Sequence, residues 1–167
     1  TGRYLWVMIR GKIMARSPSG NAIRIIGTLT DISTTKQTER QLRLNAQVFE
    51  HAGEGILITD RFNRIISVNQ AFTRITGYEL TEVLGKTPAI LSSGKHDEVF
   101  YQSLWTAVMQ HDYWQGEIWN KRKNREDYPE WLTITAVRQA DGQISNFIGS
   151  FSDLSERKKQ DDHIQFL

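Results

Sequence analysis

The amino-acid sequence predicts an α+β fold built on one five-stranded antiparallel sheet, and three observations support this prediction. Two strand-like segments are followed by several short helical segments and then by three more strand-like segments, an order typical of α+β domains. The segment Gly27–Ser33 is echoed 122 residues later by Gly149–Ser155, and a repeat at that spacing indicates tandem domains. The chain has 167 residues, of which 39% are hydrophobic, so it can bury a substantial core.

The first 50 residues are predicted to be a hairpin followed by a linker helix. Strands at Tyr4–Ala15 and Ala22–Ile32 flank the turn sequence Ser-Pro-Ser-Gly-Asn. The first copy of the repeat begins only at its last two strands. Residues 1–32 are therefore interpreted as the C-terminal hairpin of a preceding, truncated domain. Residues 33–50 are predicted to form the linker helix, with Ser33 as its N-cap.

Residues 51–153 are predicted to form the complete domain. Alternating apolar residues indicate strands, and apolar residues spaced three and four apart indicate a longer helix. The predicted strands are Ile56–Asp60, Arg64–Val68, Trp114–Lys121, Tyr128–Arg138 and Gln143–Ser152. The predicted helices are Gln70–Thr76, Thr81–Leu84 and Asp97–Gln110, with an exit helix over residues 154–167.

Composition excludes several classes of function. The chain contains no cysteine, which excludes disulfides, iron–sulfur clusters and a flavin–cysteine photoadduct. Residues 1–44 carry eight basic and two acidic residues, but no nucleic-acid recognition motif accompanies them. We therefore expect no nucleic-acid partner. No apolar run approaches the length of a membrane span, so we expect a soluble, cytoplasmic segment whose parent protein could still be membrane-anchored.

Four motifs in order resemble the signature of PAS sensor domains, over residues 46–160. They are Asn69-Gln-Ala-Phe72 through Gly77-Tyr78, Glu82-Val-Leu-Gly85-Lys86, Trp114-Gln-Gly116 through Asn120-Lys-Arg-Lys123, and Gly149 through Asp153-Leu-Ser155. The resemblance implies the PAS fold, with short helices on one face of the sheet. It also identifies residues 1–32 as the final hairpin of a preceding PAS domain.

The resemblance implies a ligand pocket between the sheet and the short helices. FAD, bound noncovalently, is the cofactor we expect, because Trp105, Asn120 and Glu130 match positions in flavin-binding sensors of nitrogen-fixation regulators and in light sensors. Asn120 would anchor the flavin edge and Trp105 would pack beside it. The full set of expected cofactor contacts is Leu57, Asn69, Ile90, Trp105, Trp114, Ile118, Asn120, Glu130, Leu132 and Ile134.

Each of these residues also has a structural interpretation. Trp105 could be simple core, Asn120 could satisfy backbone groups near the following turn, and Glu130 could reach water or pair with a basic residue. The sequence also departs from flavin-binding relatives, since Leu57 and Pro88 replace polar contacts and Phe151 replaces a glutamine. The alternative hypothesis is therefore a ligand-free PAS module for dimerisation and relay.

Other cofactors and catalysis are not expected. His96 and His111 lie at the ends of the predicted long helix rather than on the face where an axial haem ligand would lie. No ligand set has zinc spacing, so no metal is expected. Ser92-Ser93-Gly94-Lys95 lacks the full phosphate-loop spacing, so this segment is not expected to be an enzyme.

The signal is expected to leave through Asp153 and Arg157, with Asp153 capping the exit helix and Arg157 as its basic partner one turn away. The sequence from Glu156 onward is similar to connectors that lead into GGDEF domains. We therefore expect an output domain beyond Leu167 that makes or degrades cyclic-di-GMP. Trp119 and Trp131 should point outward from the sheet, where the linker helix or a second subunit would cover them in a homodimer.

Overall fold

The computed structural model describes residues 4–165, with side chains described up to residue 160. It divides the chain between Gln47 and Val48 into two compact units, which are described separately. Among the described residues, no helix combines the length and the apolar character needed to cross a lipid bilayer.

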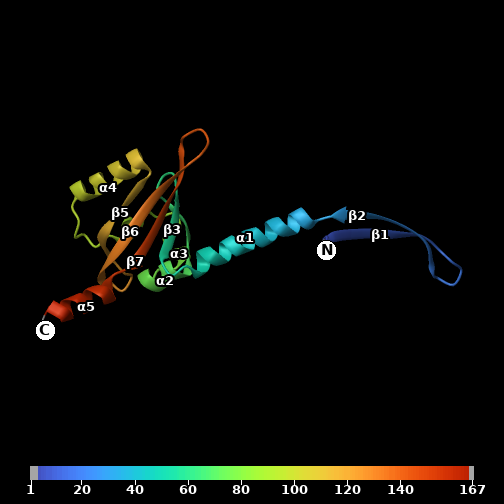
Figure 1. Ribbon diagram of the computed structural model, residues 1–167, viewed down its shortest axis with the longest axis horizontal. Helices are drawn as coiled ribbons and strands as arrows, with labels where there is room; N and C mark the ends of the chain where they lie inside the picture. Colours follow the sequence, from blue (N-terminus) through green and yellow to red (C-terminus); the bar gives the residue numbers. More distant parts are fainter. Residues whose placement is uncertain (1–3, 166–167) are drawn as a thin grey trace. The chain divides into compact units, whose positions relative to one another are not determined.

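The first unit is a two-stranded hairpin followed by most of a helix. Strands β1 (Val7–Arg16) and β2 (Ala22–Asp31) pair antiparallel, and α1 (Ser33–His51) begins two residues after β2 (Figure 1). Every described side chain of β2 is exposed. The hydroxyl of Ser33 accepts a hydrogen bond from the Trp6 N–H at 3.0 Å, so it holds the hairpin rather than capping the helix as expected.

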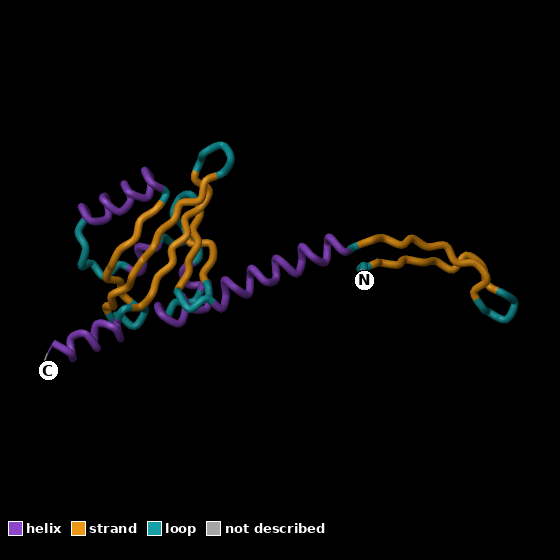
Figure 2. Tube along the Cα trace, viewed as in Figure 1, coloured by secondary structure: helices purple, strands orange, loops and turns teal. Residues whose placement is uncertain are grey.

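The second unit contains the complete sheet, and it confirms the predicted α+β class. Its strand order is β4-β3-β7-β6-β5, and every neighbouring pair is antiparallel. Figure 2 shows the strands of this unit in orange and its helices in purple. The strands are β3 (Gly55–Asp60), β4 (Ile65–Val68), β5 (Tyr113–Lys121), β6 (Asp127–Arg138) and β7 (Ile144–Asp153). The helices are α2 (Gln70–Thr76), α3 (Leu80–Val83), α4 (Glu98–His111) and α5 (Ser155–Gln165). A short 3-10 helix, η1 (Pro88–Leu91), was not predicted.

Local capping explains where the helices begin and end. Asn69 accepts a hydrogen bond from the Phe72 N–H at the start of α2, and Gly77, with a φ of 79°, ends that helix in the left-handed region. Asp97 caps α4 in the same way through the Phe100 N–H. Asn69 and Asp97 therefore fix the first residues of α2 and α4, and Gly77 fixes the last residue of α2.

The core lies between one face of the sheet and the helices, in two clusters. One joins strands β3, β4 and β7 to α2, α3 and η1, and its buried members are Leu57, Ile65, Val68, Phe72, Val83, Leu91 and Phe151. The other packs α4 against β6 and β7 through Leu104, Val108, Ala136 and Phe147. The space around Trp105, between η1, α4 and the sheet, holds the candidate site.

Candidate functional site

Two neighbouring cavities of about 370 and 70 Å³ lie between the sheet and the η1 and α4 helices. They share a wall formed by Asn63, Pro88, Trp105, Asn120, Leu132 and Ile134. Ile118 lines the larger cavity, whereas Leu57 and Glu130 line the smaller one. Most of the residues expected to contact a cofactor therefore surround these two cavities.

The alternation of β5 and β6 brings the polar pair of the cavity together. Ile118 lies opposite Glu130 in the β5–β6 register, and Asn120 lies opposite Tyr128, so all four side chains share the inner face. The Asn120 amide donates a hydrogen bond of 2.8 Å to Glu130 Oε1. Asn120 is 8% exposed and Glu130 only 1%, so Glu130 does not reach solvent.

Glu130 carries the most unusual electrostatics of the site. Its second carboxyl oxygen, Oε2, and the Tyr128 hydroxyl lack a hydrogen-bond partner among the described residues. Burial raises the pKa of Glu130 to about 7, although its interactions with the neighbouring Tyr128 hydroxyl and with the Asn120 amide lower it. Burial also raises the pKa of the neighbouring Tyr128. Near neutral pH, Glu130 therefore populates both its neutral and its charged form.

Three of the expected cofactor contacts, Asn69, Ile90 and Trp114, do not line the two cavities, and their contact with a cofactor stays a prediction. Asn69 uses its side chain on backbone groups, accepting from the Ile56 and Phe72 N–H groups and donating to two carbonyls. Ile90 packs against the core cluster that contains Leu57. Trp114 packs edge-on against Phe100 beneath α4, with ring centroids 6.1 Å apart.

Trp105 serves both interpretations given to it. Its ring packs edge-on against Phe147, at a centroid distance of 5.4 Å, as a core residue would. It also lines both cavities.

The mouth of the larger cavity is formed by residues that the sequence did not single out. They come from η1 and its flanks and from α4, namely Thr87, Ala89, Ser92 and Tyr101. The segment after η1 is fastened to the outer edge of β5: Ser93 Oγ donates to the Trp119 carbonyl at 2.6 Å, and His96 Nε2 accepts from the Trp119 N–H at 2.9 Å. His96 therefore has a structural role at the cavity rim. No periodic pattern could have indicated this short segment.

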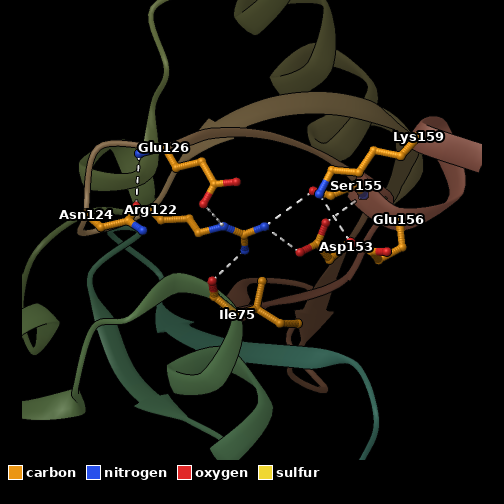
Figure 3. Close-up of polar contacts among 8 residues, drawn as sticks. All are labelled: Ile75, Arg122, Asn124, Glu126, Asp153, Ser155, Glu156 and Lys159. Atoms are coloured by element: carbon orange, nitrogen blue, oxygen red, sulfur yellow. Dashed lines mark hydrogen bonds and ion pairs between the residues drawn. The ribbon is translucent and has the colours of Figure 1, made fainter. Parts of the chain in front are cut away.

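Arg122 links the sheet to the exit helix (Figure 3). Its Nη2 lies 2.6 Å from Asp153 Oδ2, and its Nη1 donates to the Ile75 carbonyl at the end of α2, also at 2.6 Å. The guanidinium also lies over the Tyr128 ring, 4.0 Å from its centroid. Arg157 was therefore the wrong partner for Asp153; it lines a groove beside α5.

Asp153 caps the exit helix as predicted. Its Oδ1 accepts a 2.8 Å hydrogen bond from the Ser155 N–H in the first turn of α5. Although partial burial raises it, the hydrogen bonds from Ser155 and the ion pair with Arg122 hold the pKa of Asp153 below its ordinary value. Asp153 thus stays ionised at neutral pH.

The two tryptophans of the outer sheet face differ in their surroundings. Trp119 is half-buried, with Lys95 Nζ 4.0 Å and Lys158 Nζ 5.2 Å from its ring centroid, so lysine side chains cover part of it. Trp131 remains 45% exposed and lines a groove of about 610 Å³ together with Arg157 and Lys158. Within the described part of the chain, no cluster of three or more acidic or histidine side chains is arranged to hold a metal ion.

Comparison with known proteins identifies similar chains. The sequence profile of the PAS domain matches residues 53–156. The chain is 30% identical to a nitrogen fixation regulatory protein of Klebsiella oxytoca, over 71% of this chain and 24% of that protein. It is 27% identical to a blue-light-activated histidine kinase of Rhizobium johnstonii, over 81% of this chain and 40% of the kinase.

A solved structure supports the same fold. The crystal structure of a PAS domain from Colwellia psychrerythraea superposes with a TM-score of 0.65 at 21% identity, covering 70% of this chain and 98% of that one. The chain spans less than half the length of the two curated relatives described above.

Proposed function

The chain belongs to the PAS domain family, and from this premise we propose that its sensory domain binds FAD in the two cavities and relays the state of the flavin to the exit helix. The observation that carries the proposal is the Asn120–Glu130 pair, buried in the wall of an otherwise largely apolar cavity. Such a cavity, with a few polar anchors, suits a planar heterocycle. A bound flavin would supply reversible electron transfer.

The donor set of the cavity fits the edge of a flavin ring. That edge alternates hydrogen-bond donors and acceptors, and the Asn120 amide offers both kinds of group. The unpartnered Oε2 of Glu130 is a further polar atom that a ligand could satisfy. The absence of cysteine excludes a flavin–cysteine adduct.

The relatives support a sensory role of this kind. One is a nitrogen fixation regulatory protein, to which the chain is 30% identical, and another is a blue-light-activated histidine kinase, to which it is 27% identical. The transmission route in the proposal runs through Arg122 and Asp153 to α5, because these residues join the end of α2 to the first turn of that helix. In the parent protein, we place a cyclic-di-GMP output domain beyond Leu167, in a cytoplasmic homodimer that makes no contact with nucleic acid.

A ligand-free relay is the second candidate. The Asn120 amide and one oxygen of Glu130 already satisfy each other, so the pair does not require a ligand to hold it. In that case the cavity would serve packing, and the domain would act through dimerisation.

One experiment separates the two candidates. The chain is purified natively, and a second portion is refolded with excess FAD; both are then examined by visible absorbance and by mass spectrometry of the denatured supernatant. A flavin spectrum with a released mass equal to that of FAD is the expected result. A colourless protein without a released small molecule, even after refolding with FAD, would reject flavin binding and favour the ligand-free relay.

A further inference from the structure

A line of side chains runs along the inner face of the sheet from the cavity to the exit helix. It begins at Asn120 and Glu130, continues through Tyr128, two residues before Glu130 on β6, and reaches Arg122, whose guanidinium stacks on the Tyr128 ring. It ends at Asp153. In the β6–β7 register Asp153 lies directly opposite Glu130, so the two carboxyl groups are cross-strand neighbours.

Glu130 is surrounded by few charged groups. The titratable or charged groups that face it are Tyr128 from its own strand, Asp153 from β7 and Arg122 from the turn between β5 and β6. The residues that line the smaller cavity from β3, η1 and α4 are uncharged, namely Leu57, Thr59, Pro88, Leu91 and Trp105. The charge on Glu130 is therefore sensed mainly by this one cation and this one acid.

Arg122 contacts Asp153 and also Tyr128, the neighbour of Glu130 on the inner face of β6. Its Nη2 forms an ion pair with Asp153 and donates to Ser155 Oγ at 3.3 Å, which holds the first turn of α5, whereas its Nε forms a second ion pair with Glu126 at 3.4 Å. Its guanidinium also lies over the ring of Tyr128, which is two residues from Glu130 on β6. Interactions between charges are screened less in this interior than in water, so a new negative charge on Glu130 acts on both partners.

Resting on the proposed relay, we infer that the protonation state of Glu130 controls how firmly Arg122 holds Asp153, and so transmits the content of the cavity to α5. With Glu130 neutral, Arg122 remains on Asp153 and the first turn of α5 is fixed. With Glu130 ionised, its carboxylate attracts Arg122 and repels Asp153, and the contact loosens. A ligand that accepts a hydrogen bond from Glu130 favours the first state, whereas a ligand that donates to it favours the second.

The switch operates near neutral pH. Because burial raises the pKa of Glu130 to about 7, the neutral form dominates below that pH and the carboxylate above it. Asp153 remains ionised throughout this range, since its pKa is lowered.

The inference is tested on the full chain by nuclear magnetic resonance between pH 5.5 and 8.5. The Arg122 Nη–Hη resonances, which report on the contact with Asp153, and the side-chain carboxyl carbons of Asp153 and Glu130 are followed together. We expect the Arg122 and Asp153 signals to move with the same midpoint as the Glu130 carboxyl. Glu130→Gln should abolish that transition, whereas Glu98→Gln, on the exposed start of α4, should leave it unchanged.

Two outcomes would overturn the inference: Arg122 and Asp153 signals that stay constant while Glu130 titrates, or a transition that persists in Glu130→Gln. If that variant does not fold, the coincidence of midpoints in the wild type decides the question. The test needs no ligand. A colourless protein with a Glu130-linked transition rejects flavin binding and supports the inference. A protein that binds flavin but lacks the transition supports flavin binding and rejects the inference.

Discussion

Glu130 is a carboxyl group placed where a charge is costly. It is 1% exposed, and Asn120 satisfies only one of its oxygens. Most buried acids in proteins are paired with a cation, but here the nearest cation, Arg122, is bound to Asp153. The residue therefore lowers stability whenever it is ionised.

Glu130→Gln should remove a pH dependence of stability. The folded state binds the proton more tightly than the unfolded chain, because burial raises the pKa from 4.5 to about 7. The free energy of unfolding of the wild type should therefore fall between about pH 4.5 and 7, by about 3 kcal/mol in total. Urea unfolding at pH 5 and pH 8 measures this loss.

In the variant, this part of the pH dependence should be absent, and its stability should exceed that of the wild type at pH 8. Glu98→Gln, at an exposed position, is the matched control and should follow the wild type. Equal slopes for the wild type and Glu130→Gln would contradict the buried, proton-binding role of this residue.

Asn120→Ala should weaken flavin binding, because it removes a polar anchor from the cavity wall and leaves Glu130 Oε1 without its donor. A loss of about 1–3 kcal/mol is expected, which corresponds to roughly a five- to 150-fold rise in the dissociation constant. Titration of the refolded protein with FAD, followed by fluorescence, measures the change. Asn45→Ala, in an exposed part of α1, is the control and should bind like the wild type.

At the scale of elements, the close approach of β3 to β7 depends on a glycine. Gly55 lies opposite Phe151 in the register, and a Cβ at this position would overlap the Phe151 ring. Phe151 is 1% exposed and belongs to the core cluster, so it has little room to move.

Gly55→Ala should therefore destabilise the domain by about 1–3 kcal/mol, the range for overpacked cores. Gly53→Ala is the matched control, since a Cβ there would meet no atom within 4 Å. Thermal unfolding of the two variants measures the difference. If Gly55→Ala unfolds at the same temperature as Gly53→Ala, then Phe151 is not held as the packing indicates.

The attachment of α5 to the sheet depends on the several hydrogen bonds that the Arg122 guanidinium donates at once. Arg122 reaches Asp153, Ser155 and the Ile75 carbonyl together, from a hairpin that precedes α5 by more than 30 residues. A lysine keeps the charge but cannot reach all three acceptors at once.

Arg122→Lys should loosen the first turn of α5 and speed amide exchange there, while the central strands remain protected. The expected loss of stability is about 1–3 kcal/mol. Hydrogen exchange with mass spectrometry resolves the two regions, and Arg64→Lys, at an exposed position, serves as control. Unchanged exchange in α5 would show that Asp153 caps this helix without help from Arg122.

At the scale of the whole molecule, the outer face of the sheet is the surface proposed for self-association. Trp131 is 45% exposed there. The lysine side chains of Lys95 and Lys158 lie over Trp119 and leave Trp131 exposed. A large exposed aromatic residue of this kind commonly marks an interaction surface.

Trp131→Glu should weaken self-association, because it places a charge at the centre of the proposed interface. Sedimentation velocity over a range of concentrations measures the effect. Met109→Glu, at an exposed position of α4, should leave the association state unchanged. A wild-type protein that is monomeric at all concentrations, or a Trp131→Glu variant that associates normally, would reject this face as the dimer contact.

The order of strands and helices was determined by the sequence alone. Alternation with period two, helical spacing and turn residues are local properties, and they placed each strand and α-helix within a few residues of its observed bounds. The same alternation on β5 and β6 correctly sent Ile118, Asn120, Glu130 and Leu132 inward, because side chains on a strand must alternate between faces.

Only the tertiary structure decided what each side chain meets. The sequence suggested Arg157 for Asp153 because it lies one turn away, whereas the fold brings in Arg122 from a distant hairpin. Asn69 resembled a ligand contact but binds backbone groups, and the rim from Thr87 to Ser92 has no periodic pattern. Periodicity determines the face on which a residue lies; the partner opposite it depends on loops whose paths are set by long-range packing.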